Sequence, residues 1–404
     1  MRRAIAAGVL LAAAALGAGC RGEARRSGDP AGELAALVDS LRPGVERATG
    51  LRFRSPPRSA LRTRTQVRGY LIAKLDEELP PERLRGIETA YRLFGLLSDT
   101  LELRELLLDL YTEQVAGYYD PDSAMLFGVE GADRSQLRLV LAHELIHALQ
   151  GQYLPLDSIL SATRNNDRLT AAQAVLEGQA TLSSIEVLAP GQDVAANPEF
   201  WDLYRNQVRT QQSSMPVFRR APLVLREALI FPYLQGAEFM YWWRRSEHGD
   251  TLPYGPRMPV SSEQILHPER YARGDVPLGL TLEPEPGALY EDVMGENEIR
   301  VILATLAGSD EVQTVVPLGW GDDRYRLYET ADGPALVWYA VWDDARAAGR
   351  FLRAAAGLRR PARAGYRAQV DSLDVSGAAA TRLVLAPPGW SRWDSLPAAR
   401  LEGR

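Results

Sequence analysis

The sequence has 404 residues but only one cysteine, Cys20, and only four histidines. A single cysteine excludes an intrachain disulfide and excludes a zinc site built from several thiolates. Any bound transition metal must therefore be held by histidine nitrogens and carboxylate oxygens. The four histidines are His143, His147, His248 and His267.

The chain also lacks an excess of positive charge. The chain has 46 Lys and Arg against 52 Asp and Glu, for a formal net charge of −6. Binding of nucleic acid requires a concentrated basic surface, so we expect no nucleic-acid partner. The sequence contains no phosphate-binding loop, dinucleotide fingerprint or GxSxG nucleophile elbow, which argues against nucleotide-dependent enzymes and serine hydrolases of the α/β-hydrolase type.

The one long apolar run lies at the N-terminus, in MRRAIAAGVLLAAAALGAGC. Two arginines precede an apolar segment too short to span a bilayer, and small residues then lead to Cys20. This resembles a bacterial lipoprotein signal, although Gly17 stands where leucine is usual. We expect residues 1–19 to be a signal peptide and residues 20–32 to be a lipidated cysteine and flexible tether. The protein would then be anchored in the cell envelope, outside the cytoplasm. An ordinary secretory signal with a chance cysteine is the alternative.

Residues 33–117 show a helical pattern, with apolar residues recurring every three or four positions. The pattern then changes in GYYDPDSAMLFGV, where two extended runs flank the turn-forming sequence DPDS. We expect a β-hairpin over residues 117–129. Its second strand, residues 124–129, is expected at a sheet edge, where it could pair with an extended peptide.

The rest of the chain predicts more helices and then a change of character. Asp133 can cap a helix over about 134–150, a second helix covers about 170–188, and helical stretches continue to about 247. A proline-rich loop follows, to residue 286. Beyond it the pattern predicts helices at about 290–306 and 343–358, and strands at 325–329, 335–341, 366–370 and 381–385.

We therefore expect an α+β protein with two domains. Residues 33–288 would form a mainly helical domain with a small β-hairpin or sheet. Residues 289–404 would form a small C-terminal α+β domain. The role of this second domain and the oligomeric state do not follow from the sequence.

The residues that carry chemistry are His143-Glu144-Leu145-Ile146-His147. Two histidines four positions apart on a helix project from one face and can bind one Zn²⁺. Glu144 is rotated about 100° from His143 and can take a proton from a zinc-bound water. An isolated carboxylate among apolar neighbours would be costly, which favours a metal site over an ordinary core helix.

A catalytic zinc needs a third protein ligand, and Glu177 is the best candidate. It lies on the next predicted helix, where its face continues with Ala180, Thr181 and Ser184. Small side chains around one carboxylate suggest close approach to a partner helix. Asp157 and Asp167 are alternatives.

An HExxH helix followed by a downstream glutamate resembles the gluzincin metallopeptidases, the thermolysin-like class. The resemblance implies a zincin-like catalytic domain in which His143, His147 and Glu177 bind zinc and Glu144 is the general base. Many gluzincins carry an acid four residues after the third ligand, where it orients a ligand histidine. Here that position is Thr181, so the histidine must be oriented by another group.

A closer resemblance is to uncharacterised bacterial lipoproteins with an HExxH helix. The shared segments are EQVAGYYDP, LAHELIHALQ, LEGQAT, SSEQILHPERY and GWGDDRY, at 113–121, 141–150, 176–181, 261–271 and 319–325. By analogy with thermolysin-like enzymes, His267 is a candidate to stabilise the oxyanion, with Tyr271, Tyr118 and Tyr119 as alternatives.

Together these features predict a zinc-dependent peptidase that cuts peptide or protein substrates in the cell envelope. The alternative is a lipoprotein whose metal site is structural or inactive and which acts in binding or assembly.

Overall fold

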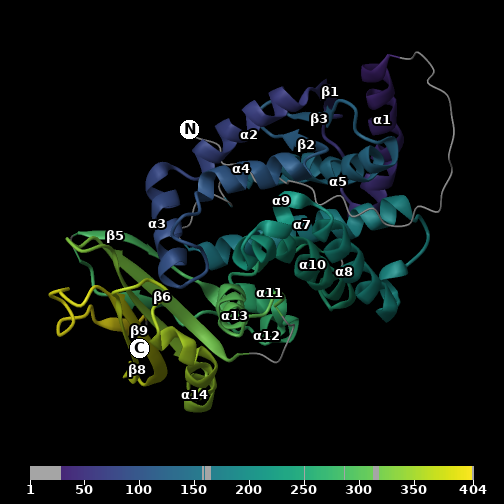
Figure 1. The fold of residues 1–404 in the computed structure, drawn as a ribbon. Coiled ribbons are helices and arrows are strands. Elements are labelled where there is room, and N and C mark those ends of the chain that lie inside the picture. The colour runs from purple at the N-terminus through teal and green to yellow at the C-terminus, as the bar shows by residue number, and fades with distance from the viewer. Residues whose placement is uncertain are drawn as a thin grey trace.

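The computed structural model describes residues 29–156, 159, 165–249, 251–285, 287–312 and 318–402. The predicted signal peptide, Cys20 and the alternative ligand Asp157 lie outside the described residues. The described chain is α+β, with a mainly helical part that carries a three-stranded sheet and a C-terminal part that carries a five-stranded sheet (Figure 1). None of the helices in these ranges is long and apolar enough to span a membrane.

The first helix begins earlier than predicted. Helix α1 spans Pro30–Thr49, so the end of the expected tether is helical. The side chain of Asp29 accepts a hydrogen bond from the Ala31 amide, and Pro30 fits the first turn because a missing N–H needs no partner there. The helices that follow are α2 (Arg64–Glu78), α3 (Pro81–Leu93) and α4 (Leu103–Gln114). They confirm the helical character of this region.

The predicted hairpin is present and belongs to a larger sheet. Strand β2 (Gly117–Asp120) pairs antiparallel with β3 (Met125–Val129), and β1 (Arg58–Arg62) pairs in parallel with β3. The order is β1-β3-β2. The prediction that residues 124–129 form an edge strand is therefore wrong, because β1 covers the open side of β3. The short segment that forms β1 shows no alternating pattern and is a strand because of this long-range pairing.

Three long helices form the middle of the helical part (Figure 1). Helix α5 (Arg134–Tyr153) lies beside α7 (Asn166–Leu188), and α10 (Leu223–Arg245) packs against α7. A Cβ on Gly178 would lie 2.2 Å from the backbone carbonyl of Gly236, so only glycine permits this contact. The other elements of this part are η1 (Val194–Ala196), α8 (Pro198–Ser213), α9 (Pro216–Arg220), η2 (Gly255–Arg257), α11 (Ser262–Leu266) and α12 (Pro268–Ala272).

The C-terminal part is built around an antiparallel sheet of order β5-β6-β7-β9-β8. The helix expected from residue 290 begins only at Gly295, because residues 288–292 pair with β6 as strand β5. The elements are β4 (Leu280–Leu282), β5 (Ala288–Asp292), α13 (Gly295–Leu306), β6 (Trp320–Tyr328), β7 (Ala335–Trp342), α14 (Ala345–Ala354), η3 (Ala355–Arg359), β8 (Arg367–Val375), β9 (Ala378–Ala386) and β10 (Ala399–Leu401). Strand β10 pairs with β4 in a separate two-stranded sheet.

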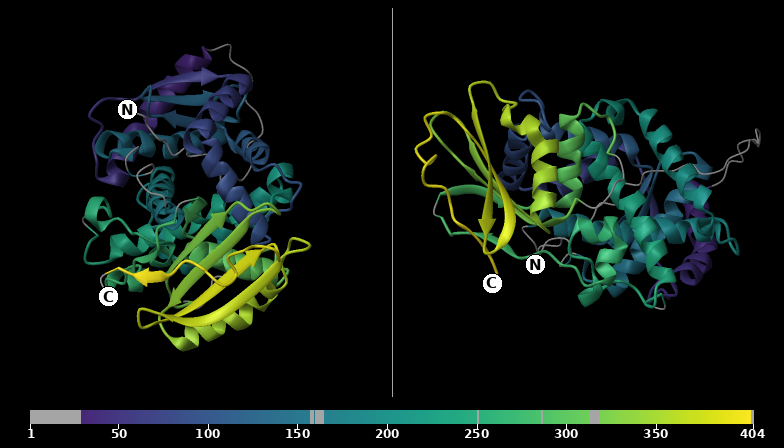
Figure 2. Two further views of the ribbon diagram at one scale, coloured as in Figure 1. Left: turned by 90° about the vertical axis from the view of Figure 1, so that its left-hand side faces the viewer. Right: turned by 90° about the horizontal axis from the view of Figure 1, so that it is seen from below.

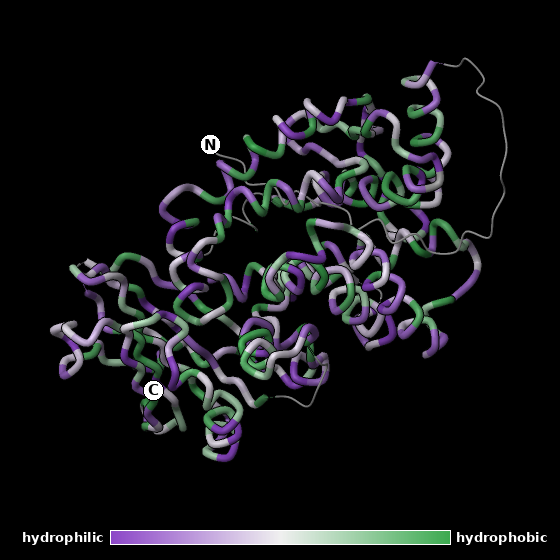
Figure 3. Tube along the Cα trace, viewed as in Figure 1, coloured by the Kyte–Doolittle hydropathy of each residue, from purple (hydrophilic) through white to green (hydrophobic). Residues whose placement is uncertain are grey.

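The two parts share a hydrophobic core. Phe94, just after α3, packs edge-on against Trp338 of β7 with ring centroids 5.3 Å apart. Helices α13 and α14 lie on the face of the sheet that is turned toward the helical part (Figure 2). Polar and apolar residues alternate along the helices, as amphipathic elements packed on a common core require (Figure 3).

Candidate metal centre

The HELIH segment lies on α5, whose N-terminus is capped as predicted: the Gln136 amide donates to Oδ1 of Asp133 at 3.3 Å. Four residues are slightly more than one helical turn, so His143 and His147 project from the same face, with ring centroids 4.7 Å apart. Both residues are buried, with relative exposures of 2% and 9%. The helix thus presents two imidazoles to the interior.

Helix α7 brings Glu177 to these two rings. Its Oε2 lies 3.0 Å from Nε2 of His143 and 3.2 Å from Nε2 of His147, and the two nitrogens are 3.0 Å apart. Tetrahedral zinc bonds of about 2.0–2.2 Å place ligand atoms roughly 3.3 Å from one another. Among the described residues, this trio is the group that could hold a metal ion. The alternative ligand Asp167 lies elsewhere on α7, where it accepts a hydrogen bond from the Ser262 amide.

The charges of the trio are strongly coupled. Burial alone would raise the pKa of Glu177, but the charge of His147 and hydrogen bonds from both histidines hold this pKa well below its usual range. Burial acts to lower the pKa of His147, and the Glu177 carboxylate outweighs it and raises the pKa to about 9. For His143 burial prevails, and its pKa is lowered. A proton is thus held between His147 and Glu177, and a metal ion that binds there must displace it.

Glu144 lies beside the trio with one oxygen held and the other uncommitted. Its Oε2 accepts a hydrogen bond of 2.7 Å from the Tyr119 amide of β2. Within the described part of the chain, its buried Oε1 has no hydrogen-bond partner. Burial raises the pKa of Glu144 to about 8, and the nearby charge of His147 opposes the shift only in part. A positioned carboxyl with a pKa near neutrality has the properties of a general base.

Two residues at this centre were not predicted from the sequence. Tyr233 of α10 stacks on His143, with ring centroids 5.9 Å apart, and its hydroxyl hydrogen-bonds Glu177. Gln150 of α5 accepts a hydrogen bond from His147. Nothing distinguishes Tyr233 from the other fifteen of the 16 tyrosines in the sequence. The position of Gln150, three residues after His147, was a usable signal, because residues three apart are neighbours on a helix.

The structure does not bring His267 to the metal centre. Its Nε2 lies 3.0 Å from Oε1 of Glu296, on α13. Asp167, which contacts the same α11 region through Ser262, is ten residues and about 15 Å along α7 from Glu177. The predicted oxyanion role of His267 therefore has no support from its position.

The alternative tyrosines are placed differently. Tyr119 reaches the centre through its backbone amide, as described above. The ring of Tyr118 stacks instead on Tyr70, with centroids 4.3 Å apart. The hydroxyl of Tyr271 donates to the Arg257 carbonyl.

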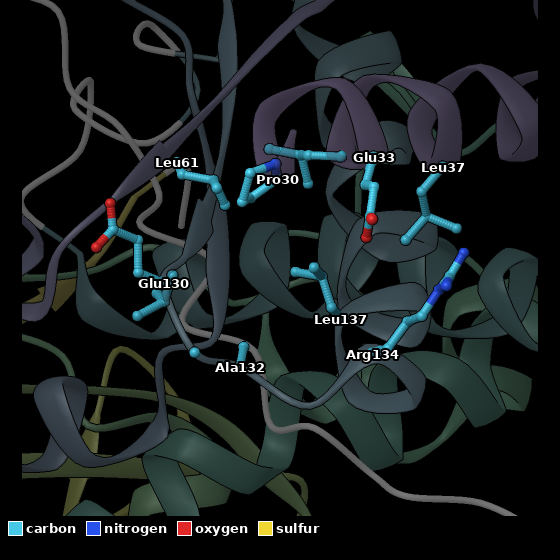
Figure 4. Close-up of a pocket in the computed structure, with 11 residues that line it drawn as sticks. Pro30, Glu33, Leu37, Leu61, Glu130, Ala132, Arg134 and Leu137 are labelled. Atoms are coloured by element: carbon cyan, nitrogen blue, oxygen red, sulfur yellow. The ribbon is translucent and has the colours of Figure 1, made fainter. Parts of the chain in front are cut away.

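A small cavity of about 20 Å³ adjoins Glu144 and His147, and Tyr119, Leu156 and Leu176 help to line it. This volume is enough for about one water molecule. A wider pocket of about 500 Å³ lies elsewhere, between α1 and the start of α5 (Figure 4). Leucines line much of it, with Glu33 and Arg134 among its polar residues, and it contains no histidine. The small cavity is therefore the one relevant to the metal centre.

Comparison with known proteins bears only on the C-terminal part. Residues 283–386 match a family described as a domain of unknown function, DUF8575. The match covers β5 to β9, close to the predicted boundary at residue 289, and leaves the metal centre outside. No curated protein and no solved structure matches the chain.

Proposed function

We propose that the protein is a zinc-dependent peptidase with a gluzincin-like centre. The observation that carries the proposal is the convergence of His143, His147 and Glu177 beside a Glu144 carboxyl that has one uncommitted oxygen. The sheet β1-β3-β2 next to the HExxH helix supports a zincin-like architecture for this part.

The donor set suits zinc. Two imidazole nitrogens and one carboxylate oxygen are the protein ligands of many catalytic zinc sites, which keep a further position open. A zinc ion held there supplies Lewis acidity and lowers the pKa of water toward neutrality. The aliphatic surroundings of α5 exclude bulk water, which strengthens every charge interaction at the centre.

The residues of the chain have separate roles in this proposal. Oε1 of Glu144 accepts a proton from the attacking water and later passes it to the leaving amine. The Tyr119 amide fixes the carboxylate through Oε2, so that Oε1 keeps its direction. The hydroxyl of Tyr233 is the donor best placed to stabilise negative charge on the carbonyl oxygen, in place of His267.

We also propose that Cys20 is lipidated and that the protein acts at a membrane surface of the cell envelope. The N-terminal sequence is the basis for this part. Cys20→Ser should abolish incorporation of labelled lipid and release the protein from the membrane fraction. A wild-type protein recovered wholly soluble, with another unmodified N-terminus, would contradict the anchor.

A second function has a specific observation in its favour. The ligands are only 2–9% exposed, and the adjoining cavity holds about one water molecule, so the ion could be structural in a protein that acts in binding or assembly. A substitution of Glu144 distinguishes the two functions, because a structural metal site does not require the Glu144 carboxylate.

The deciding experiment compares peptides released from envelope extracts by the wild-type protein and by Glu144→Gln, with zinc content measured for both. The proposal expects peptides that only the wild-type protein releases, at equal zinc content. Identical peptide sets from two zinc-loaded proteins would favour the structural role.

A further inference from the structure

Gln150 occupies a central place between the two helices that carry the metal ligands. It lies on α5, three residues after His147, and is 1% exposed. Its Oε1 is 2.8 Å from Nδ1 of His147. Its Nε2 donates to the carbonyl of Leu176 at 3.0 Å and to Oε1 of Gln179 at 2.7 Å. All three contacts are made to a ligand or to residues within two positions of Glu177.

These contacts fix which way the Gln150 amide faces. A backbone carbonyl can only accept a hydrogen bond, so the group facing Leu176 must be the NH₂ of Gln150. The amide oxygen then faces His147 and can only accept. It follows that Nδ1 of His147 carries a proton. Nε2, the nitrogen that faces Glu177 and His143, is then the one that can bind a metal ion once the proton shared with Glu177 is displaced.

The amide of Gln179 extends the same arrangement. Its Oε1 accepts from Gln150 and from the hydroxyl of Tyr254, so two donors converge on one oxygen. Gln179 is fully buried and lies two residues after Glu177. The chain of contacts therefore runs from a ligand on α5, across to α7, and on to the segment before η2.

We propose that Gln150 is a positioning residue that holds His147 in the Nδ1-protonated form and ties α5 to α7 around Glu177. The inference rests on the proposed zinc site. It also identifies the group that orients the histidine in a chain whose Thr181 stands where related enzymes carry an acid. Because the Gln150 amide is neutral, it orients the ring without adding a negative charge beside the ligands.

The test combines zinc affinity with the state of the His147 ring. Gln150→Ala removes all three contacts and should weaken zinc binding roughly 10–100-fold in competition with a chelator. In nitrogen-15 NMR spectra, the wild-type protein should show a slowly exchanging proton on Nδ1 of His147, and this signal should be lost in Gln150→Ala. Gln150→Glu keeps an acceptor oxygen at the same reach and should restore the signal.

Gln152→Ala is the matched control. Gln152 lies on the same helix, but its amide contacts the backbone of Arg54 and Ser55 rather than any metal ligand. This variant should retain wild-type zinc affinity and the Nδ1 proton signal. An effect equal to that of Gln150→Ala would point to general loosening of α5 and overturn the specific role.

The two proposals fail in different ways. A folded wild-type protein that binds no zinc would overturn the zinc peptidase, while the Nδ1 proton would still report whether Gln150 holds His147. A wild-type protein that binds zinc, with equal affinity in Gln150→Ala, would overturn the positioning role. So would a wild-type protein in which Nδ1 of His147 carries no proton, a result that does not depend on any variant folding.

Discussion

Helix α7 passes through two clusters of buried carboxylates, and their partners differ. In the middle of the helix, Glu177 faces two histidines, and neighbouring Glu144 has one oxygen without a partner among the described residues. At its start, Asp167 of α7 lies close enough to Asp323 of β6 and Glu298 of α13 to interact with them electrostatically. The two oxygens of Asp323 accept four hydrogen bonds, from the amides of Met294 and Gly295 and from two tryptophan rings.

This difference in hydrogen-bond partners distinguishes carboxylates that could take part in a reaction from carboxylates that hold the fold together. Buried carboxylates whose oxygens accept hydrogen bonds from neutral donors fix elements in place. Here Asp167 joins α7 to α11, Glu298 joins α13 to α7, and Asp323 joins the C-terminal sheet to the start of α13. A buried carboxylate left with an uncommitted oxygen beside two imidazoles is costly unless a ligand or a reaction uses it. We therefore expect substitutions at the first cluster to change metal binding and catalysis, and substitutions at the second to change stability.

The largest effect is expected for His147→Ala. This change removes one of the three proposed ligands and the ring that Gln150 contacts, so zinc should be lost and peptidase activity should fall to background. Metal analysis of the purified variant, with circular dichroism as a check of folding, measures this. Undiminished zinc in a folded His147→Ala protein would contradict the assignment. Retained zinc in Glu177→Ala would move the third ligand elsewhere.

Glu144→Gln should abolish turnover without removing the metal. The amide keeps the size of the side chain and can still accept from the Tyr119 amide, but it is a very poor base. A positioned base is typically worth 10²–10⁴-fold, so kcat should fall by about that factor. Steady-state kinetics on a cleaved peptide, with zinc measured in the same sample, gives the answer. Wild-type rates in the variant would rule out this mechanism.

The sequence predicted the candidate metal centre better than its surroundings. The HExxH spacing and the small residues after Glu177 predicted the three side chains that the structure brings together and the glutamate beside them, because a helix fixes the relation of nearby residues. Tyr233 could not be found, since it reaches His143 only through the packing of α10 on α7. His267 was assigned by analogy of order along the chain, and tertiary packing placed it beside Glu296 instead. Strand β1 was missed for the same reason: its pairing with β3 joins segments more than sixty residues apart.

Tyr233→Phe tests the residue that now takes the proposed oxyanion role. It removes one hydroxyl and keeps the ring that stacks on His143. Loss of one donor to developing charge typically costs about 10²–10³-fold in kcat, with zinc content and KM little changed. His267→Ala serves as the comparison and should leave kcat near the wild-type value. The opposite result, with a normal rate for Tyr233→Phe and a slow His267→Ala, would restore the assignment made from the sequence.

Glu298→Gln tests the second cluster and should have the smallest effect on activity. Oε1 of Glu298 accepts hydrogen bonds from the Tyr91 hydroxyl and from the side-chain amide of Asn166, and a glutamine oxygen can accept both. Burial raises the pKa of Glu298 to about 8, although the hydrogen bond from Tyr91 opposes the shift.

Because the pKa of Glu298 is raised in the folded protein, the free energy of unfolding depends on pH. Between the ordinary carboxyl pKa and about 8, the folded protein keeps a proton on Glu298 that the unfolded chain releases. Stability should therefore fall as pH rises through this range, by up to about 1.4 kcal/mol per pH unit for this group. Glu298→Gln mimics the protonated form, so its free energy of unfolding should fall less steeply, while zinc content and kcat stay unchanged. Denaturant titrations between pH 5 and pH 8 measure the two slopes.

Equal slopes would mean that Glu298 is ionised in the folded protein. A loss of zinc would mean that the two clusters on α7 are coupled, and the division between chemistry and architecture would no longer hold.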